Sequence, residues 1–317
     1  MFAFAILSEE RNIYINYKGI FIDKFSNTFK IAYNLTRRFE MNQVDKIIKN
    51  VIDNLENVKG IDAIVLAGSR ARKTNDENSD IDIGIYYNDD FKPGSLNDIA
   101  CRLDDQNRGD LISGLGDWGP WLDGGGWLLI DGYQVDLIFR QTEKLEEIID
   151  QVQLGKITNN YHPGHPHAYM NYMYMGELAI CKILYSRDDK IKKLKSKALV
   201  YPDKLAEQII KTNIFEANLS LMMAKDNIYN DDIYYLVGHY FRVISCLNQV
   251  IFSLNKEYLI NEKKAVKMID GFKIKPKDYK DRVDQVFELT KTNTKVLYLS
   301  YKELESLLED VNKLVEG

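Results

Sequence analysis

The chain has 317 residues, of which 45% are hydrophobic and 28% charged, so its composition is that of an ordinary globular protein and argues against wholesale disorder. Its 42 Lys and Arg against 47 Asp and Glu give a net charge of -5. This charge disfavours a dedicated nucleic-acid binder, because neutralising phosphates requires a clustered basic face.

Membrane and export signals are absent from the sequence pattern. No stretch reaches the roughly 18 consecutive apolar residues of a membrane span, and MFAFAIL at the start lacks the basic region of a signal peptide. The cysteines at 101, 181 and 246 are far apart and show no CxxC spacing, which favours reduced, buried thiols. We therefore expect a cytoplasmic protein without a membrane partner.

Residues 1–40 are rich in aromatic side chains and show no single period, whereas a clean amphipathic segment begins at Met41. We treat 1–40 as an N-terminal extension, and the sequence leaves open whether it belongs to the native protein. A functional start at Met41 is one hypothesis, which an intact Met1 in the mass spectrum of the natively expressed protein would exclude.

From Met41 to residue 55, apolar residues recur at helical spacing and predict a helix. IDAIVLA, at 61–67, predicts a buried strand that Gly68-Ser69 breaks, and a short helix follows over 69–75. A second strand is predicted over 80–87.

The next segment, KPGSLNDIACRL, predicts a helix with Ser95 as its N-cap. Two β-rich runs, 126–130 and 133–140, are joined by Asp131-Gly132, a strong hairpin signal. TEKLEEIIDQVQ then returns to a helical period. Residues 41–158 are thus expected to combine helices with a small mixed sheet.

Beyond about residue 168 the apolar period is helical throughout. The predicted helices are 170–185, 203–225, 231–255 and a last one around 304–314. GKITNNYHPGHPH, rich in turn formers, marks the boundary. The fold class is therefore α+β: a domain over 41–158 with a mixed β-sheet, followed by an α-helical bundle domain over 159–317.

Asp80 and Asp82 interrupt an otherwise apolar strand. Side chains alternate along a strand, so both carboxylates lie on one face, roughly 6.5–7 Å apart at their Cβ atoms. Two unpaired carboxylates this close repel, and their burial is costly. A divalent cation removes that cost, and Mg²⁺ prefers carboxylate oxygens and keeps positions open for phosphate.

Gly68 and Ser69 follow one strand and precede a short helix. A glycine there lets the backbone approach a ligand closely, and free N–H groups and the serine hydroxyl suit phosphate. Arg70 could steer a triphosphate. In YQVDLIFR, Asp136 again interrupts an apolar strand, and beside the first carboxylate strand it would complete a triad for two metals.

Gly68-Ser69, ten intervening residues, Asp80-Ile81-Asp82 and the later strand residue Asp136 resemble the polymerase-β-like nucleotidyltransferase superfamily. WGPWLDGGGWLLIDGYQVDLIFR and YMGELAICKILY further resemble a bacterial subgroup with a helical C-terminal domain. That subgroup is similar in layout to aminoglycoside and lincosamide nucleotidyltransferases, which makes antibiotic resistance a possible role.

The resemblance implies a transferase that moves NMP, with AMP from ATP as the expected case, to an acceptor hydroxyl and releases pyrophosphate. It implies two Mg²⁺ ions held by Asp80, Asp82 and Asp136, and phosphates held by Gly68, Ser69 and Arg70. Glu177 is implied as general base toward the acceptor, with Glu216 in reserve and an ion-pair role as its alternative.

The acceptor stays open. A small hydroxyl-bearing molecule is the first hypothesis, a protein acceptor in a toxin–antitoxin system the second, and a non-catalytic nucleotide sensor the third. The acidic balance disfavours tRNA. Nucleotide preference and oligomeric state do not follow from the sequence.

Plainer interpretations accompany these assignments. Asp80 and Asp82 alone would also fit a solvated edge strand, Arg72 and Lys73 a solvated helix face. Arg140 either contacts phosphate or pairs with a carboxylate.

Among the aromatic residues, Trp127 is expected to be packed in its strand, while Trp118 and Trp121 either form an aromatic wall for a base or pack a corner. His162, His165 and His167 crowd together without a cysteine or carboxylate in the motif, so a structural joint is favoured over a zinc site.

Overall fold

The computed structural model describes residues 41–230, 232–290 and 293–317. The predictions for residues 1–40 lie outside the described residues. The chain divides between Ile47 and Ile48, and the architecture below is that of the second unit. Helix α2 (Gln43–Leu55) runs across this division, at the place where the sequence predicts a helix.

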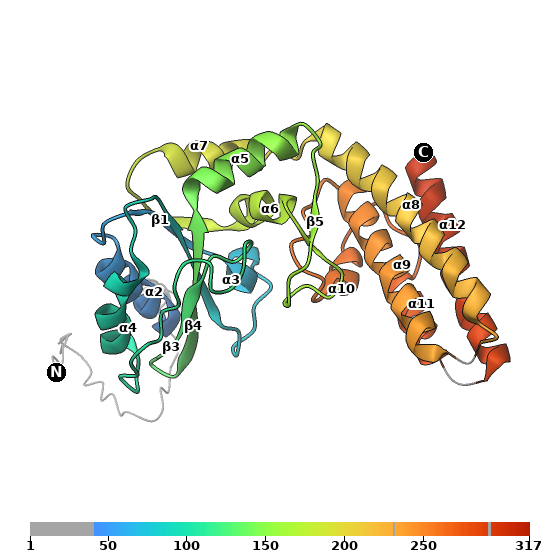
Figure 1. The fold of residues 1–317 in the computed structure, drawn as a ribbon, viewed down its shortest axis with the longest axis horizontal. Coiled ribbons are helices and arrows are strands. Elements are labelled where there is room, and N and C mark those ends of the chain that lie inside the picture. Colours follow the sequence, from blue (N-terminus) through green and yellow to red (C-terminus); the bar gives the residue numbers. More distant parts are fainter. Residues whose placement is uncertain (1–40, 231, 291–292) are drawn as a thin grey trace, which may run out of the picture. The chain divides into compact units, whose positions relative to one another are not determined.

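A five-stranded sheet forms the frame of the N-terminal half (Figure 1). In spatial order its strands are β3 (Gly125–Ile130), β4 (Tyr133–Gln141), β2 (Ile81–Tyr87), β1 (Ile61–Leu66) and β7 (Lys182–Ser186). β2 and β4 pair in parallel, and the other neighbours pair antiparallel. The sheet is thus mixed, as predicted.

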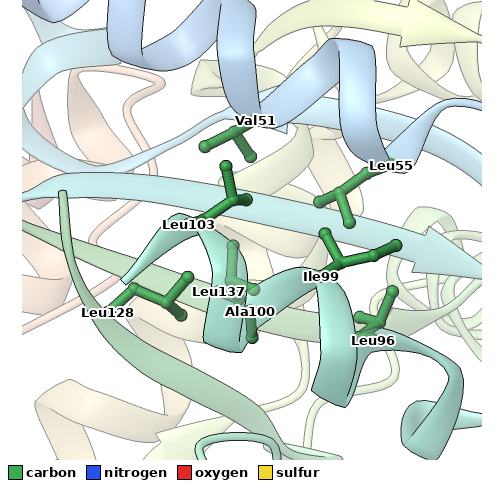
Figure 2. Close-up of a pocket in the computed structure, with 8 residues that line it drawn as sticks. All are labelled: Val51, Leu55, Leu96, Ile99, Ala100, Leu103, Leu128 and Leu137. Atoms are coloured by element: carbon green, nitrogen blue, oxygen red, sulfur yellow. The ribbon is translucent and has the colours of Figure 1, made fainter. Parts of the chain in front are cut away.

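One face of this sheet is apolar along the centres of β2 and β4. Ile81, Ile83 and Leu137 are buried on it and face α2 and α4 (Asn97–Leu103). Figure 2 shows apolar side chains converging there around a cavity of about 10 Å³. Its lining consists of Val51, Leu55, Leu96, Ile99, Ala100, Leu103, Leu128 and Leu137. A space this small without polar groups stays dry and binds no polar ligand.

The other face is covered over part of its length. Ala63, Val65 and Tyr86 pack in one apolar cluster with three helices. These helices are α5 (Thr142–Gln153), α6 (Tyr172–Ile180) and α7 (Lys190–Ala198). α5 has the bounds that its sequence predicts.

The hairpin prediction is confirmed, since Asp131 and Gly132 join β3 to β4 with positive φ angles of 51° and 79°. The predicted cap at Ser95 is wrong. A 3₁₀ turn, Pro93–Leu96, precedes α4, and the Ser95 hydroxyl donates to the carbonyl of Lys92 within that turn. Pro93 starts the tighter turn, so Leu96 occupies the N-cap position of α4.

The helix predicted over 170–185 is wrong in its second half. α6 ends at Ile180, and Lys182–Ser186 forms β7, which pairs with β1. The ammonium of Lys195 donates to the carbonyls of Leu178, Ala179 and Cys181 at 2.8–2.9 Å. A cation on the last carbonyls ends the helix favourably, and helical periodicity alone does not reveal such a long-range cap.

The C-terminal half is helical, as predicted, and the α+β fold class is confirmed. Its main helices are α8 (Asp203–Asn227), α9 (Ile233–Leu254), α11 (Tyr279–Glu288) and α12 (Thr294–Glu316). α10 (Ala265–Ile269) and a small sheet of β5 (Asn159–Asn160) and β6 (Tyr169–Met170) complete the described elements. Figure 1 shows α8, α9 and α12 packed side by side.

The predicted boundary between residues 158 and 159 stays a prediction, although β7 shows that residues beyond it contribute to the sheet. Within the described ranges, no helix has both the length and the apolar character needed to cross a membrane.

Replacing Lys195 by Met should lower the free energy of unfolding by about 1.5–3 kcal/mol, because three carbonyls lose a charged donor. Urea denaturation measures this change. Lys192→Met, on the exposed side of the same helix, is the control and should cost less than about 0.5 kcal/mol. Equal losses for the two variants would contradict the capping role.

Candidate functional site

Two of the predicted carboxylates lie directly side by side. β2 and β4 pair in parallel with Asp82 opposite Asp136, and Ile81 and Ile83 lie opposite Val135 and Leu137. Neighbouring strands are about 4.8 Å apart, and paired residues point to the same face. The register therefore brings Asp82 and Asp136 together on the face opposite the apolar one.

Asp80 precedes β2 and is exposed, and alternation places it on the same side as Asp82. Burial raises the pKa of Asp82 to about 6, and the charges of Asp136 and Asp80 add to the rise, while Arg70 and Lys263 oppose it. Burial also raises the pKa of Asp136, partly offset by a hydrogen bond from Gln134 at 3.2 Å. The three carboxylates thus form one electrostatically coupled group.

Gly68 makes the close packing around Asp82 possible. It has φ of 60°, and a Cβ built on it would lie 1.8 Å from Oδ2 of Asp82. Ala67, which directly precedes Gly68, donates its backbone N–H to the carbonyl of Asp82 at 2.8 Å. The glycine turn and the carboxylate strand are therefore in contact, as the predicted site requires.

Helix α3 (Gly68–Arg72) carries Ser69 and Arg70 next to this contact. The Arg70 guanidinium donates to the carbonyls of Asp80 at 2.9 Å and Ser79 at 2.5 Å, so it fixes the chain that enters β2. Arg72 is not on a solvated face, because it donates to the carbonyl of Tyr258 at 3.2 Å and burial lowers its pKa.

Two residues near the carboxylates were missed from the sequence. Gln134 shares a strand face with Asp136 and hydrogen-bonds it. Lys263 precedes α10 and lies close enough to oppose the raised pKa of Asp82. The Lys263-Lys264 pair was the only signal for the second, and nothing local in the sequence links it to β2.

The indole of Trp127 lies beside the carboxylates. Trp127 is opposite Asp136 in the β3–β4 ladder, is 53% exposed, and stacks on Trp118 with ring centroids 4.5 Å apart. The packed role expected for Trp127 is therefore wrong. Trp121, in contrast, packs against Tyr169 in the cluster beneath α6.

Arg140 and Glu177 form a separate, closed ion pair. Nε and Nη2 of Arg140 donate to the two Glu177 oxygens at 2.8 and 3.0 Å, and Arg140 is 4% exposed. Arg140 is four residues beyond Asp136 on β4, roughly 13 Å at 3.3 Å per residue. The carboxylate-pairing alternative for Arg140 is the one that the structure contains, and the base role of Glu177 stays a prediction.

Glu216, the reserve base, is paired with Arg242 at 3.0 Å. The loop that carries His162, His165 and His167, called the histidine loop below, is in part a structural joint. Glu262 accepts a hydrogen bond from the backbone N–H of His167 and contacts Nδ1 of His165 at 3.1 Å.

The donor set fits divalent cations. Three carboxylates converge, and none forms an ion pair within the described residues, so the charges of Arg70 and Lys263 offset their mutual repulsion only in part. An all-oxygen set of this kind is what Mg²⁺ prefers, and a bound cation would reverse the pKa rise of Asp82. The half-exposed Trp127 and the Gly68 turn border the same group.

Comparison with known proteins gives one family match. Residues 49–114 match the family described as polymerase beta, nucleotidyltransferase; this range contains Gly68, Ser69, Asp80 and Asp82 and ends before Asp136. No curated protein matches the chain. A crystal structure of a nucleotidyltransferase-like protein from Exiguobacterium sibiricum 255-15 is similar with 12% identity and a TM-score of 0.41, over 85% of this chain and 77% of that one.

Asp82→Asn should stabilise the metal-free protein at neutral pH. A pKa raised from 3.8 to about 6 corresponds to about 3 kcal/mol as an upper limit. In the wild-type protein the raised pKa favours the folded state with Asp82 protonated. The stability that Asp82 contributes is therefore complete below pH 3.8 and is lost as pH rises through about 6. Urea denaturation in chelator should show the gain at about pH 7.5 and none at about pH 4. Asp98→Asn, at an exposed position of α4, is the control and should give the same small change in stability at both pH values. A pH-independent effect of Asp82→Asn would contradict the assignment.

Gly68→Ala should disturb the carboxylates. The new Cβ strains the left-handed backbone by about 1–2 kcal/mol and displaces the Asp82 carboxylate. We expect affinity for Mn²⁺, as a probe for Mg²⁺, to fall about 10- to 100-fold by titration with paramagnetic resonance detection. Gly94→Ala, where a Cβ meets nothing within 4 Å, is the control. Wild-type Mn²⁺ affinity in Gly68→Ala would refute the role of this contact.

Proposed function

We propose that this protein, whose residues 49–114 match the polymerase beta, nucleotidyltransferase family, is a Mg²⁺-dependent enzyme that transfers AMP from ATP to a hydroxyl of a small molecule and releases pyrophosphate. The observation that carries the proposal is the parallel register of Asp82 and Asp136 against the Gly68 turn. A domain match alone does not imply activity, whereas an intact, coupled carboxylate group is a specific requirement of the chemistry.

Asp80, Asp82 and Asp136 would hold the two Mg²⁺ ions, which supply charge neutralisation for the triphosphate and the attacking oxygen. The carboxylates themselves would fix the position of the reacting groups, since Asp82 and Asp136 lie side by side on two hydrogen-bonded strands and Asp80 directly precedes one of them. A site on rigid strands keeps its geometry better than a site on loops.

Gly68 and Ser69 take the β- and γ-phosphates in this proposal, because they occupy the turn that touches Asp82. Arg70 acts by holding Ser79 and Asp80 in place, since its guanidinium already binds their carbonyls. Lys263 adds positive charge on the same side and becomes a candidate phosphate ligand.

Asp136 is assigned the role of accepting the proton that the acceptor hydroxyl loses. It would hold the metal ion that activates the acceptor hydroxyl, and it lies on β4 directly opposite the exposed Trp127. Glu177 and Glu216 are each engaged by an arginine, so a base role for either requires that pair to open. Trp127 and Trp118 present an indole surface next to Asp136 on which a nucleobase or a flat acceptor can stack.

Asp82→Ala should abolish metal-dependent pyrophosphate release, with a loss of about 1,000-fold or more, because removing a metal ligand costs several kcal/mol of transition-state stabilisation. A coupled pyrophosphate assay measures it. Asp98→Ala, on the apolar side of the sheet, should keep wild-type activity. Retained activity in Asp82→Ala would refute the assigned role.

The acceptor class is tested with α-labelled ATP against aminoglycosides, lincosamides and cell lysate. Label on a small molecule supports the proposal. Label on protein would replace the acceptor class with a protein substrate, and tight ATP binding by calorimetry without any transfer would reduce the protein to a nucleotide sensor.

A further inference from the structure

Three metal-ligating side chains meet away from the carboxylate strands. His167 lies in the loop before β6, Glu216 on α8 and Cys246 on α9. One ligand atom of each lies within 4.8 Å of the other two. The three residues come from distant parts of the sequence, so their meeting is a product of the fold and not of a local motif.

The backbone at His167 is held by Glu262, but its ring is incompletely satisfied. Its backbone N–H donates to Glu262 at 3.0 Å, and Ala168 donates to the same oxygen at 3.4 Å. Within the described part of the chain, however, Nε2 of His167 is buried without a hydrogen-bond partner. An unpartnered buried polar atom is costly and marks a place where a ligand can add stability.

Cys246 is suited to a metal and unsuited to nucleophilic chemistry. It is 0% exposed in the core of the helical region, and burial strongly raises the pKa of its thiol. A reactive cysteine needs exposure and a low pKa, whereas a coordinating thiol is deprotonated by the metal itself.

Glu216 completes the set and remains reachable from solvent. Its side chain is 21% exposed, and Arg242 holds one of its oxygens at 3.0 Å. A carboxylate ligand oriented by an outer hydrogen bond is the usual arrangement around protein metals. A thiolate and a carboxylate together carry two negative charges, which a divalent cation neutralises.

We propose that His167, Glu216 and Cys246 bind a borderline-soft divalent cation of the Zn²⁺ class, with water as the fourth ligand. Tetrahedral Zn²⁺ with bonds of 2.0–2.3 Å places its ligands about 3.3–3.8 Å apart, so atoms that already lie within 4.8 Å of one another close by at most about 1.5 Å around the ion. Thiolate and imidazole ligands select such ions over Mg²⁺. The bound ion ties the histidine loop to α8 and α9.

This site is independent of the proposed transferase chemistry and is tested without activity. The full chain is reduced, treated with chelator, desalted and titrated with Co²⁺. A thiolate-to-metal charge-transfer band in the near ultraviolet should saturate at about one Co²⁺ per chain, and Zn²⁺ should displace the ion and remove the band.

Cys246→Ser should eliminate the band and weaken Zn²⁺ binding by more than the roughly 10- to 100-fold typical of outer-shell changes. Cys181→Ser, at another buried thiol, and Asp82→Asn should both keep the band. If Cys246→Ser does not fold by circular dichroism, Glu216→Gln decides: the band remains, and affinity falls at least about 10-fold. Absence of the band in the wild-type protein, its persistence in Cys246→Ser, or unchanged affinity in Glu216→Gln would overturn the proposal.

Discussion

The charge repulsion between Asp82 and Asp136 is the constraint around which the N-terminal half is organised. Parallel pairing of β2 and β4 places the two carboxylates side by side, and burial raises the pKa of both. A sheet selected for stability alone would place apolar residues at these positions. The retained cost supports the proposed site at the carboxylate end of this sheet, because strain and unfavourable charge persist mainly where they serve a site.

The sheet face that carries the carboxylates is divided into an open and a closed end. At the open end, Gly68 leaves room for the Asp82 carboxylate, and a half-exposed Trp127 borders Asp136. At the closed end, Tyr86 and Arg140 are paired in register and covered by α5 and α6, where Glu177 neutralises the buried guanidinium. One strand pair thus carries a carboxylate group that is compensated only in part and a guanidinium that is fully paired. The partly compensated carboxylates are the ones with capacity left for a ligand.

Local signals in the sequence were sufficient for most elements and for the identity of the carboxylates. The Asp131-Gly132 hairpin and α5 follow from turn chemistry and periodicity that act over a few residues. Three features depend on contacts between distant segments and could not be predicted locally. These are the strand character of Lys182–Ser186, the register of Asp82 with Asp136, and the pairing of Arg140 with Glu177. Helical periodicity cannot distinguish a short, partly exposed strand such as β7 from a continuing helix, and register is a property of two strands together.

The histidine loop is a second case in which contacts between distant segments could not be predicted from the local sequence. Its three histidines lacked a sulfur or carboxylate partner in the sequence, and this made a structural joint the better interpretation. Folding brings Glu216 and Cys246 to His167 from two helices, so the local motif contributes one ligand of the three. The chain then contains two donor sets of different hardness: carboxylate oxygens alone at Asp80, Asp82 and Asp136, and sulfur with nitrogen at Cys246 and His167. Because Mg²⁺ prefers the first set and Zn²⁺ the second, both sites can be filled in one protein without competing for the same ion.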